Sequence, residues 1–177
     1  MSAERFLIFD GHGLMWRALH RPGAPLTSPR TKEPTRGTYT FTQMLISILR
    51  EFKPTYSVFA GDAPRSSTFR KQLFDGYKSN RPTDGPDDAM FVQMGRCRQV
   101  VEEMGMRWYV ADEFEADDVI ATLVDICAGD DVEIVIVSSD HDLNQLCTGN
   151  VIQYDPGKEL RMNEDFVRER WEVEPDQ

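Results

Sequence analysis

Short apolar runs alternate with amphipathic segments along this chain, and the alternation predicts strands separated by helices. The runs have the length of buried strands, and they cover residues 5–11, 56–60, 106–110, 132–137 and 151–154. Between the runs, apolar residues recur at the three- and four-residue spacing of one buried helix face. This spacing predicts helices over about 38–52, 88–104, 116–128 and 164–171, and a short one over 141–146.

Strands that alternate with helices form a mostly parallel sheet with helices on both faces. We therefore expect an α/β fold, and 177 residues are typical of a single domain. Ligands bind such sheets at the carboxyl ends of the strands. Residues that directly follow a predicted strand are thus the first candidates for a functional site.

The rest of the composition narrows the class of protein. Hydrophobic residues make up 40% of the chain, but no apolar run approaches the roughly 20 residues that cross a membrane. The first residues lack the pattern of a signal peptide. Cys97, Cys127 and Cys147 are odd in number and scattered, so we expect reduced thiols in a cytoplasmic protein.

The formal net charge of −10 argues against a protein that coats nucleic acid, because such proteins are basic. It leaves a nuclease open, since carboxylates that hold metal ions count as bare negative charges. Segment 65–81 carries five basic residues against one acid, with Phe69, Phe74 and Tyr77 among them. Bases stack on aromatic rings and phosphates pair with basic side chains. The segment therefore predicts either an element that binds a nucleic-acid strand or a solvated loop.

Five carboxylates crowd the seven residues 112–118, directly before a helix with an apolar face. Helix capping and the helix dipole favour acids at this position, which accounts for one or two of them. Crowded like charges repel unless cations neutralise them, and no Lys or Arg lies between Trp108 and Asp140. This stretch alone leaves two interpretations open, a capped acidic helix and a site for a divalent metal.

Carboxylates at the other strand ends favour the metal site. Acids follow four predicted strands, and they are Asp10, Asp62, the group Glu115, Asp117 and Asp118, and the pair Asp140 and Asp142. Seven carboxylates exceed the need of one Mg²⁺, which keeps several waters. They suit two Mg²⁺ or Mn²⁺ ions about 4 Å apart, the arrangement that hydrolyses phosphodiester bonds. No Gly-rich phosphate loop with a following Lys is present, so a nucleoside triphosphatase is not predicted.

Several motifs, in this order, resemble the 5′-nuclease (flap endonuclease) superfamily. They are Phe9-Asp10-Gly11, Gly61-Asp62-Ala63, Thr68-Phe69-Arg70, Tyr77-Lys78-Ser79-Asn80-Arg81-Pro82, Glu115-Ala116-Asp117-Asp118 and Ser139-Asp140-His141-Asp142-Leu143-Asn144-Gln145-Leu146. The resemblance covers nearly the whole chain, and is to the 5′–3′ exonuclease domain of bacterial DNA polymerase I and to phage 5′-exonucleases. It implies a PIN-like (resolvase-like) catalytic domain over 1–177, with a helical arch or mobile loop at about 64–88.

The resemblance also implies roles for single residues. One metal ion would be held by Asp10, Asp62, Glu115 and Asp117, and the second would lie near Asp118, Asp140 and Asp142. Basic residues of the family's helical gateway, which contact the scissile phosphate and the threaded 5′ strand, correspond to Arg70, Lys78 and Arg81, with Tyr77 in the same motif. A stacking aromatic and a nearby basic residue correspond to Trp16 and Arg17. The chain departs from the family at Gly61, where Phe is usual, and at His141, where Lys is commoner.

The resemblance breaks off at residues 173–177. Relatives continue into a Gly-Asp-x-Ser-Asp-Asn segment, which adds metal ligands, and a helix–three-turn–helix that grips duplex DNA. We therefore expect weak duplex affinity and reduced activity, unless a separate chain or a polymerase supplies this part.

Three functions follow as hypotheses. The first is an Mg²⁺- or Mn²⁺-dependent 5′–3′ nuclease on DNA with 5′ ends or flaps, in replication or repair, with RNA primer removal as a variant. Its setting would be the cytoplasm of a bacterium or of a phage-infected host. The second is a PIN-type nuclease for single-stranded RNA, and the third is a non-catalytic subunit that a partner chain completes.

Overall fold

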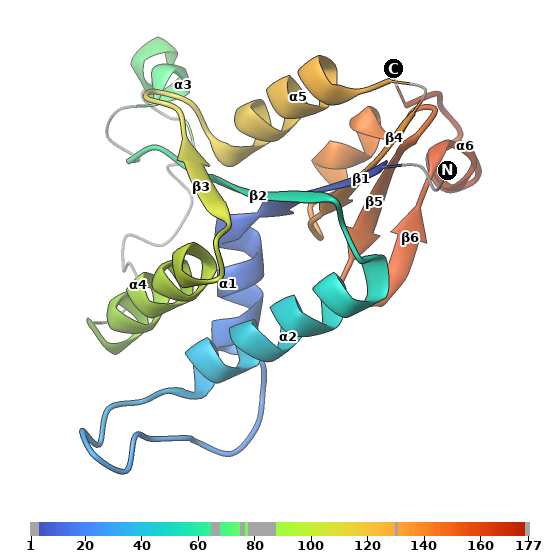
Figure 1. Ribbon diagram of the computed structural model, residues 1–177. Helices are drawn as coiled ribbons and strands as arrows, with labels where there is room; N and C mark the ends of the chain where they lie inside the picture. Colours follow the sequence, from blue (N-terminus) through green and yellow to red (C-terminus); the bar gives the residue numbers. More distant parts are fainter. Residues whose placement is uncertain (1–3, 65–67, 75–76, 78–87, 130, 176–177) are drawn as a thin grey trace.

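A six-stranded sheet in the order β3-β2-β1-β4-β5-β6 forms the centre of the protein (Figure 1). The computed structural model describes residues 4–64, 68–74, 77, 88–129 and 131–175. Within them the strands are β1 (Glu4–Asp10), β2 (Tyr56–Gly61), β3 (Arg107–Val110), β4 (Val132–Val137), β5 (Val151–Asp155) and β6 (Leu160–Met162). Strands β1 to β5 pair in parallel, and β6 pairs antiparallel with β5 at the edge.

Helices cover both faces of this sheet (Figure 1). They are α1 (Gly11–His20), α2 (Arg36–Phe52), α3 (Phe69–Leu73), α4 (Asp88–Glu103), α5 (Ala116–Cys127), the 3₁₀-helix η2 (His141–Leu146) and α6 (Glu164–Trp171). One core cluster joins the sheet to α1, α2 and α4, and a second joins it to α5 and η2. The predicted mostly parallel sheet with helices on both faces is confirmed.

The apolar runs form strands because successive side chains point to opposite faces of a sheet that is covered on both sides. In β1, Leu7 and Phe9 enter the core beneath α1 and α2, while Ile8 enters the core beneath α5. Helix α2 contributes the predicted apolar stripe, and its Phe41 and Leu45 are fully buried. The central strands are therefore fixed on both faces, which holds their carboxyl ends in place.

Some sequence-based expectations were wrong. The spacing of apolar residues in the helices predicted over 88–104 and 116–128 puts Met104 and Ile126 on the buried faces, but their exposed fractions are 43% and 72%. Ile126 follows the buried Ile120 by six residues, which is roughly 240° around a helix, so it points to solvent. Helix α1 and strand β6 were not expected, because Gly11 and Gly13 disfavour helix and β6 has only three residues.

The arch expected at about 64–88 falls mostly outside the described residues, and the described part shows only the short helix α3. The three cysteines are free thiols. No helix in the described part of the chain is long and apolar enough to cross a membrane.

Candidate active site

The strand order reverses at β1, which has β2 on one side and β4 on the other. In sheets of this kind, ligands bind in the crevice at such a reversal, beyond the carboxyl ends of the strands. Asp10 ends β1, and the loop from Ser138 to Asp142 follows β4. The fold therefore brings two of the predicted acidic groups to the same crevice.

Asp10 is the N-cap of α1 and is tied to both neighbouring segments. Its Oδ1 accepts the backbone N–H of Gly13 at 2.9 Å, and its Oδ2 accepts the Ser138 hydroxyl at 2.9 Å. Burial raises the pKa of Asp10 above its ordinary value, while these two hydrogen bonds act in the opposite direction. A nearby cation would offset the cost of the buried charge.

Asp140 lies on the loop after β4, Asp142 lies in the first turn of η2, and both are exposed. Asp140 caps η2, since its Oδ1 accepts the N–H of Asp142 at 3.0 Å. The N–H of Asp140 donates to the hydroxyl of Ser138 at 3.1 Å. Ser138 therefore links Asp10 to the loop that carries the other two acids, a role that sequence reasoning missed. Its position directly after a buried strand was the available signal.

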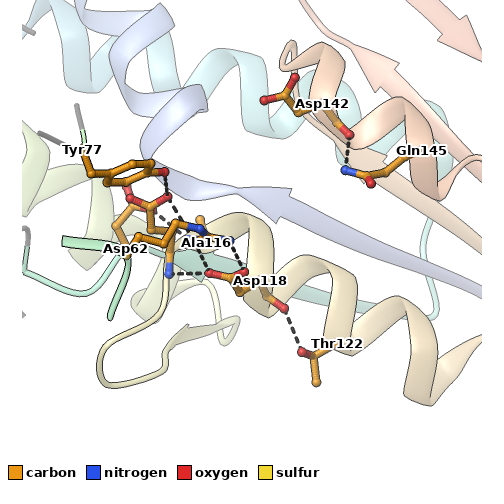
Figure 2. A network of polar contacts seen from close by, with 9 residues as sticks. Asp62, Tyr77, Ala116, Asp118, Thr122, Asp142 and Gln145 are labelled. Atoms are coloured by element: carbon orange, nitrogen blue, oxygen red, sulfur yellow. Dashed lines mark hydrogen bonds and ion pairs between the residues drawn. The ribbon is translucent and has the colours of Figure 1, made fainter. Parts of the chain in front are cut away.

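A third acidic group surrounds the N-terminus of α5 (Figure 2). Glu115 is the N-cap and is buried, and its N–H donates to Oδ2 of Asp118 at 3.0 Å. Asp62, which follows β2, accepts the N–H of Ala116 at 2.8 Å. Glu115 and Asp118 thus cap a helix, as the first interpretation of residues 112–118 predicts, and they also lie beside another strand end. Asp112 and Glu113 are exposed and outside the group.

Arg70 supplies the positive charge that the acidic stretch lacks. Its guanidinium donates two hydrogen bonds of 2.6 Å to Asp118, and its Nη1 lies 3.3 Å from Oε2 of Glu115. Tyr77 donates its hydroxyl to the same Glu115 oxygen at 2.9 Å. The bond to Asp118 raises the pKa of Arg70 further, so this residue is charged. A basic residue from a distant part of the chain therefore neutralises part of the acidic stretch, although no Lys or Arg lies near it in sequence.

Two hollows lie beside these acids. A smaller one of about 310 Å³ is lined by Arg70 and Tyr77 and by four of the predicted metal ligands, Glu115, Asp117, Asp118 and Asp142. Asp142 reaches it from η2, across from the group at α5 (Figure 2). A larger groove of about 1260 Å³ is lined by Asp10, Asp140, Trp16 and Arg17, among others. Lys78 and Arg81 lie outside the described residues.

An ion pair with a buried carboxylate fixes the position of Arg17 in the groove. Its Nη2 lies 3.3 Å from Oδ1 of Asp155, a carboxylate that is only 1% exposed. Trp16, one residue earlier, is 52% exposed. Trp16 and Arg17, two of the residues predicted to bind nucleic acid, thus lie on the groove that reaches Asp10.

Gly61 makes room for an aromatic ring at this edge. A Cβ at Gly61 would lie 2.3 Å from Nε1 of Trp108, and one at Gly11 would lie 2.4 Å from Cη2 of the same ring. Trp108 also stacks on Phe59 at 5.3 Å between centroids. The lack of a side chain at position 61, where the family usually has Phe, therefore leaves room for the ring of Trp108.

Within the described residues, no three acidic, histidine or cysteine side chains converge closely enough to form a ready metal centre. The donor set nevertheless fits a metal in its chemistry, because all seven candidates offer the hard carboxylate oxygens that Mg²⁺ and Mn²⁺ prefer. Asp10, Asp62, Glu115 and Asp117 are the candidates for one ion, and Asp118, Asp140 and Asp142 lie towards a second. The metal site remains a prediction.

The fold and the acids at its strand ends define a PIN-like α/β domain. More specifically, the chain belongs to the 5′–3′ exonuclease family, since the model of that family's N-terminal resolvase-like domain matches residues 5–172. This confirms the resemblance drawn from the motifs.

Curated relatives support the same assignment. The chain is 33% identical to DNA polymerase I of Rhizobium leguminosarum over 99% of its length, and 32% identical to that of Pseudomonas aeruginosa over 99%. It spans only 18% and 19% of those two proteins. The similarity is therefore to one part of a much longer polymerase.

Solved structures share the fold. The 5′-exonuclease of bacteriophage T5 with bound zinc ions superposes with a TM-score of 0.76 and 18% identity, over 96% of this chain and 62% of that one. The catalytic core of Rad2 in complex with DNA gives a TM-score of 0.56 and 13% identity, over 99% and 53%. At these identities the comparison establishes the PIN-like fold alone.

Proposed function

We propose that this domain is a divalent-metal-dependent 5′–3′ nuclease that hydrolyses phosphodiester bonds in DNA with free 5′ ends or flaps. The observation that carries the proposal is the position of carboxylates beyond the carboxyl ends of the strands. Asp10 and Asp140 line the groove together with Trp16 and Arg17, and Glu115, Asp117, Asp118 and Asp142 line the smaller hollow. Family membership supports the reaction. The T5 relative is described with bound metal ions and, as a flap endonuclease, with DNA.

Each group of residues would have a separate role in the reaction. The carboxylates would hold two Mg²⁺ or Mn²⁺ ions, which activate a water and stabilise the leaving oxygen when bound. Trp16 would stack on a base at the duplex end, and Arg17 would pair with a phosphate. Arg70 and Tyr77 would lie beside the scissile phosphate, because they contact Glu115 at the metal edge. Lys78 and Arg81 are proposed for the same strand from the family motif alone.

The role in the cell and the wider architecture are also proposals. The DNA polymerase relatives favour replication or repair, with removal of RNA primers as a variant. We propose that residues 1–177 act as the catalytic part, and that a duplex-gripping module is supplied by polymerase sequence or by a separate chain.

A labelled 5′-flap DNA incubated with the protein and Mn²⁺ or Mg²⁺ tests the proposal. We expect release of 5′ fragments that stops on chelation and is absent in Asp10→Asn. A single-stranded RNA hairpin serves as the competing substrate. If the protein prefers the RNA hairpin, the RNA nuclease hypothesis replaces the DNA nuclease hypothesis. If the protein binds metal but cleaves neither substrate, only the non-catalytic role is left.

A further inference from the structure

We propose that Gln153 is a positioning residue for the loop that carries Asp140 and Asp142, and that buried amides connect it to Trp171 on α6. The inference rests on the proposed function, because it concerns carboxylates that are proposed to hold a metal. Neither Gln153 nor Trp171 belongs to the motifs of the acidic site.

Gln153 lies in the middle of β5 and its exposed fraction is 0%. Its Nε2 donates to the backbone carbonyl of Ser138 at 3.0 Å and to that of Asp140 at 2.7 Å. Both hydrogens of one amide therefore bind the acidic loop from its buried side. Buried parallel strands are usually apolar, so the two hydrogen bonds account for the presence of an amide at this position.

The remaining contacts fix which way each amide points. The carbonyls of Ser138 and Asp140 only accept, so the NH₂ group of Gln153 must face them and its oxygen must face Asn144. Nδ2 of Asn144 donates to that oxygen at 2.8 Å. The oxygen of Asn144 is left to accept the indole N–H of Trp171, a group that only donates, at 3.0 Å. Neither amide can flip without leaving buried polar groups unpaired, which is unfavourable.

The loop that Gln153 holds continues directly to the acids. Ser138 donates its hydroxyl to Asp10 and accepts the N–H of Asp140, and Asp140 accepts the N–H of Asp142. The backbone is held from the core while the carboxylates of Asp140 and Asp142 are exposed at the edge. Gln153 thereby fixes the position of these carboxylates relative to Asp10. Removing partners that orient metal ligands typically lowers metal affinity by about 10- to 100-fold.

Gln153→Leu tests the inference in two measurements that need no cleavage. Isothermal titration with Mn²⁺ should show affinity weakened by about tenfold or more. Hydrogen exchange of the metal-free protein should become faster in the peptide that covers residues 138–146. Trp171→Phe keeps an aromatic ring but removes the indole N–H, and it should weaken Mn²⁺ binding in the same direction to a smaller extent.

Gln93→Leu is the matched control. Gln93 is also a buried glutamine, 8% exposed, and its Oε1 accepts the N–H of Gly37 at 2.8 Å. It lies on α4, so its loss should lower stability without changing Mn²⁺ affinity or exchange at 138–146. An equal loss of Mn²⁺ affinity in Gln93→Leu would show that general destabilisation is the cause, and would overturn the inference.

The outcomes separate this inference from the proposed function. If the unmodified protein binds no Mn²⁺, both the proposed metal site and the positioning role fail. If it binds Mn²⁺ and Gln153→Leu binds equally well with unchanged exchange, only the positioning role fails. Should Gln153→Leu not fold, Trp171→Phe decides, because unchanged Mn²⁺ affinity in that variant would refute the connection.

Discussion

Replacing Arg70 by Gln removes the charge that balances Glu115 and Asp118 and keeps much of the side chain. Two unit charges about 4 Å apart attract by about 4 kcal/mol at an effective dielectric constant of 20, whereas exposed pairs contribute about 0–1 kcal/mol. The Arg70 and Asp118 side chains are 31% and 25% exposed, which lies between these cases. We therefore expect Arg70→Gln to lower the metal-free free energy of unfolding by about 2 kcal/mol. For a chain of this size, that loss lowers the melting temperature by about 4–8 °C.

Thermal unfolding with and without Mn²⁺ is the assay. If a metal binds the same carboxylates as Arg70, added Mn²⁺ should raise the melting temperature of Arg70→Gln more than that of the unmodified protein. The double variant Arg70→Gln with Asp118→Asn completes a cycle that isolates the pair. Additive losses in that cycle, or a change below about 1 °C in Arg70→Gln, would refute the reasoning that Arg70 neutralises this site.

Three further substitutions test other contacts. Asp10→Asn should abolish cleavage and raise the melting temperature at pH 7. Burial raises the pKa of Asp10, so the folded protein loses stability as pH rises through that pKa, and Asn removes this loss. A large drop in the metal-free melting temperature would contradict this reasoning. Gly61→Ala places a Cβ 2.3 Å from Nε1 of Trp108. Urea unfolding should therefore show that the free energy of unfolding falls by about 1–3 kcal/mol. An unchanged free energy of unfolding would mean that the Trp108 ring moves freely. Gly157→Ala places a Cβ 1.5 Å from Nη1 of Arg17. The displaced guanidinium would leave the buried Asp155 carboxylate without this ion pair, so the free energy of unfolding should fall and KM for flap DNA should rise. An unchanged KM would place Arg17 outside the DNA site.

The sequence predicted the sheet well because its signal is local. Five of the six residues 132–137 are apolar, a pattern typical of a strand that is covered on both faces, and β4 has the same bounds. Acids directly after such runs are placed by the fold at one edge, so Asp10, Asp62 and Asp140 were located without coordinates. Asn163 directly precedes the helix predicted over about 164–171, and Asn is a favoured N-cap residue. Its side chain accepts the N–H of Phe166 at the start of α6.

What the sequence could not show depends on contacts between distant segments. Arg70 pairs with Asp118, 48 residues away, and no periodicity connects them. The amide chain from Gln153 to Trp171 is likewise invisible in a pattern that treats Gln153 as an interruption of an apolar run. Helix α1 was missed because its glycines weaken the local signal, although packing of Leu14, Met15 and Ala18 in the core outweighs that weakness.

The pairing of the two central strands, β1 and β4, also determines when the acidic edge forms during synthesis. β1 pairs with β4 from Glu4 opposite Val132 to Phe9 opposite Val137, so Asp10 gains its neighbour Ser138 only after this long-range pairing. A growing polypeptide leaves the ribosome from its N-terminal side at about 5–20 residues per second. Asp10 therefore emerges many seconds before the segment that completes its surroundings. A nascent chain that ends before β4 therefore lacks the contact between Asp10 and Ser138.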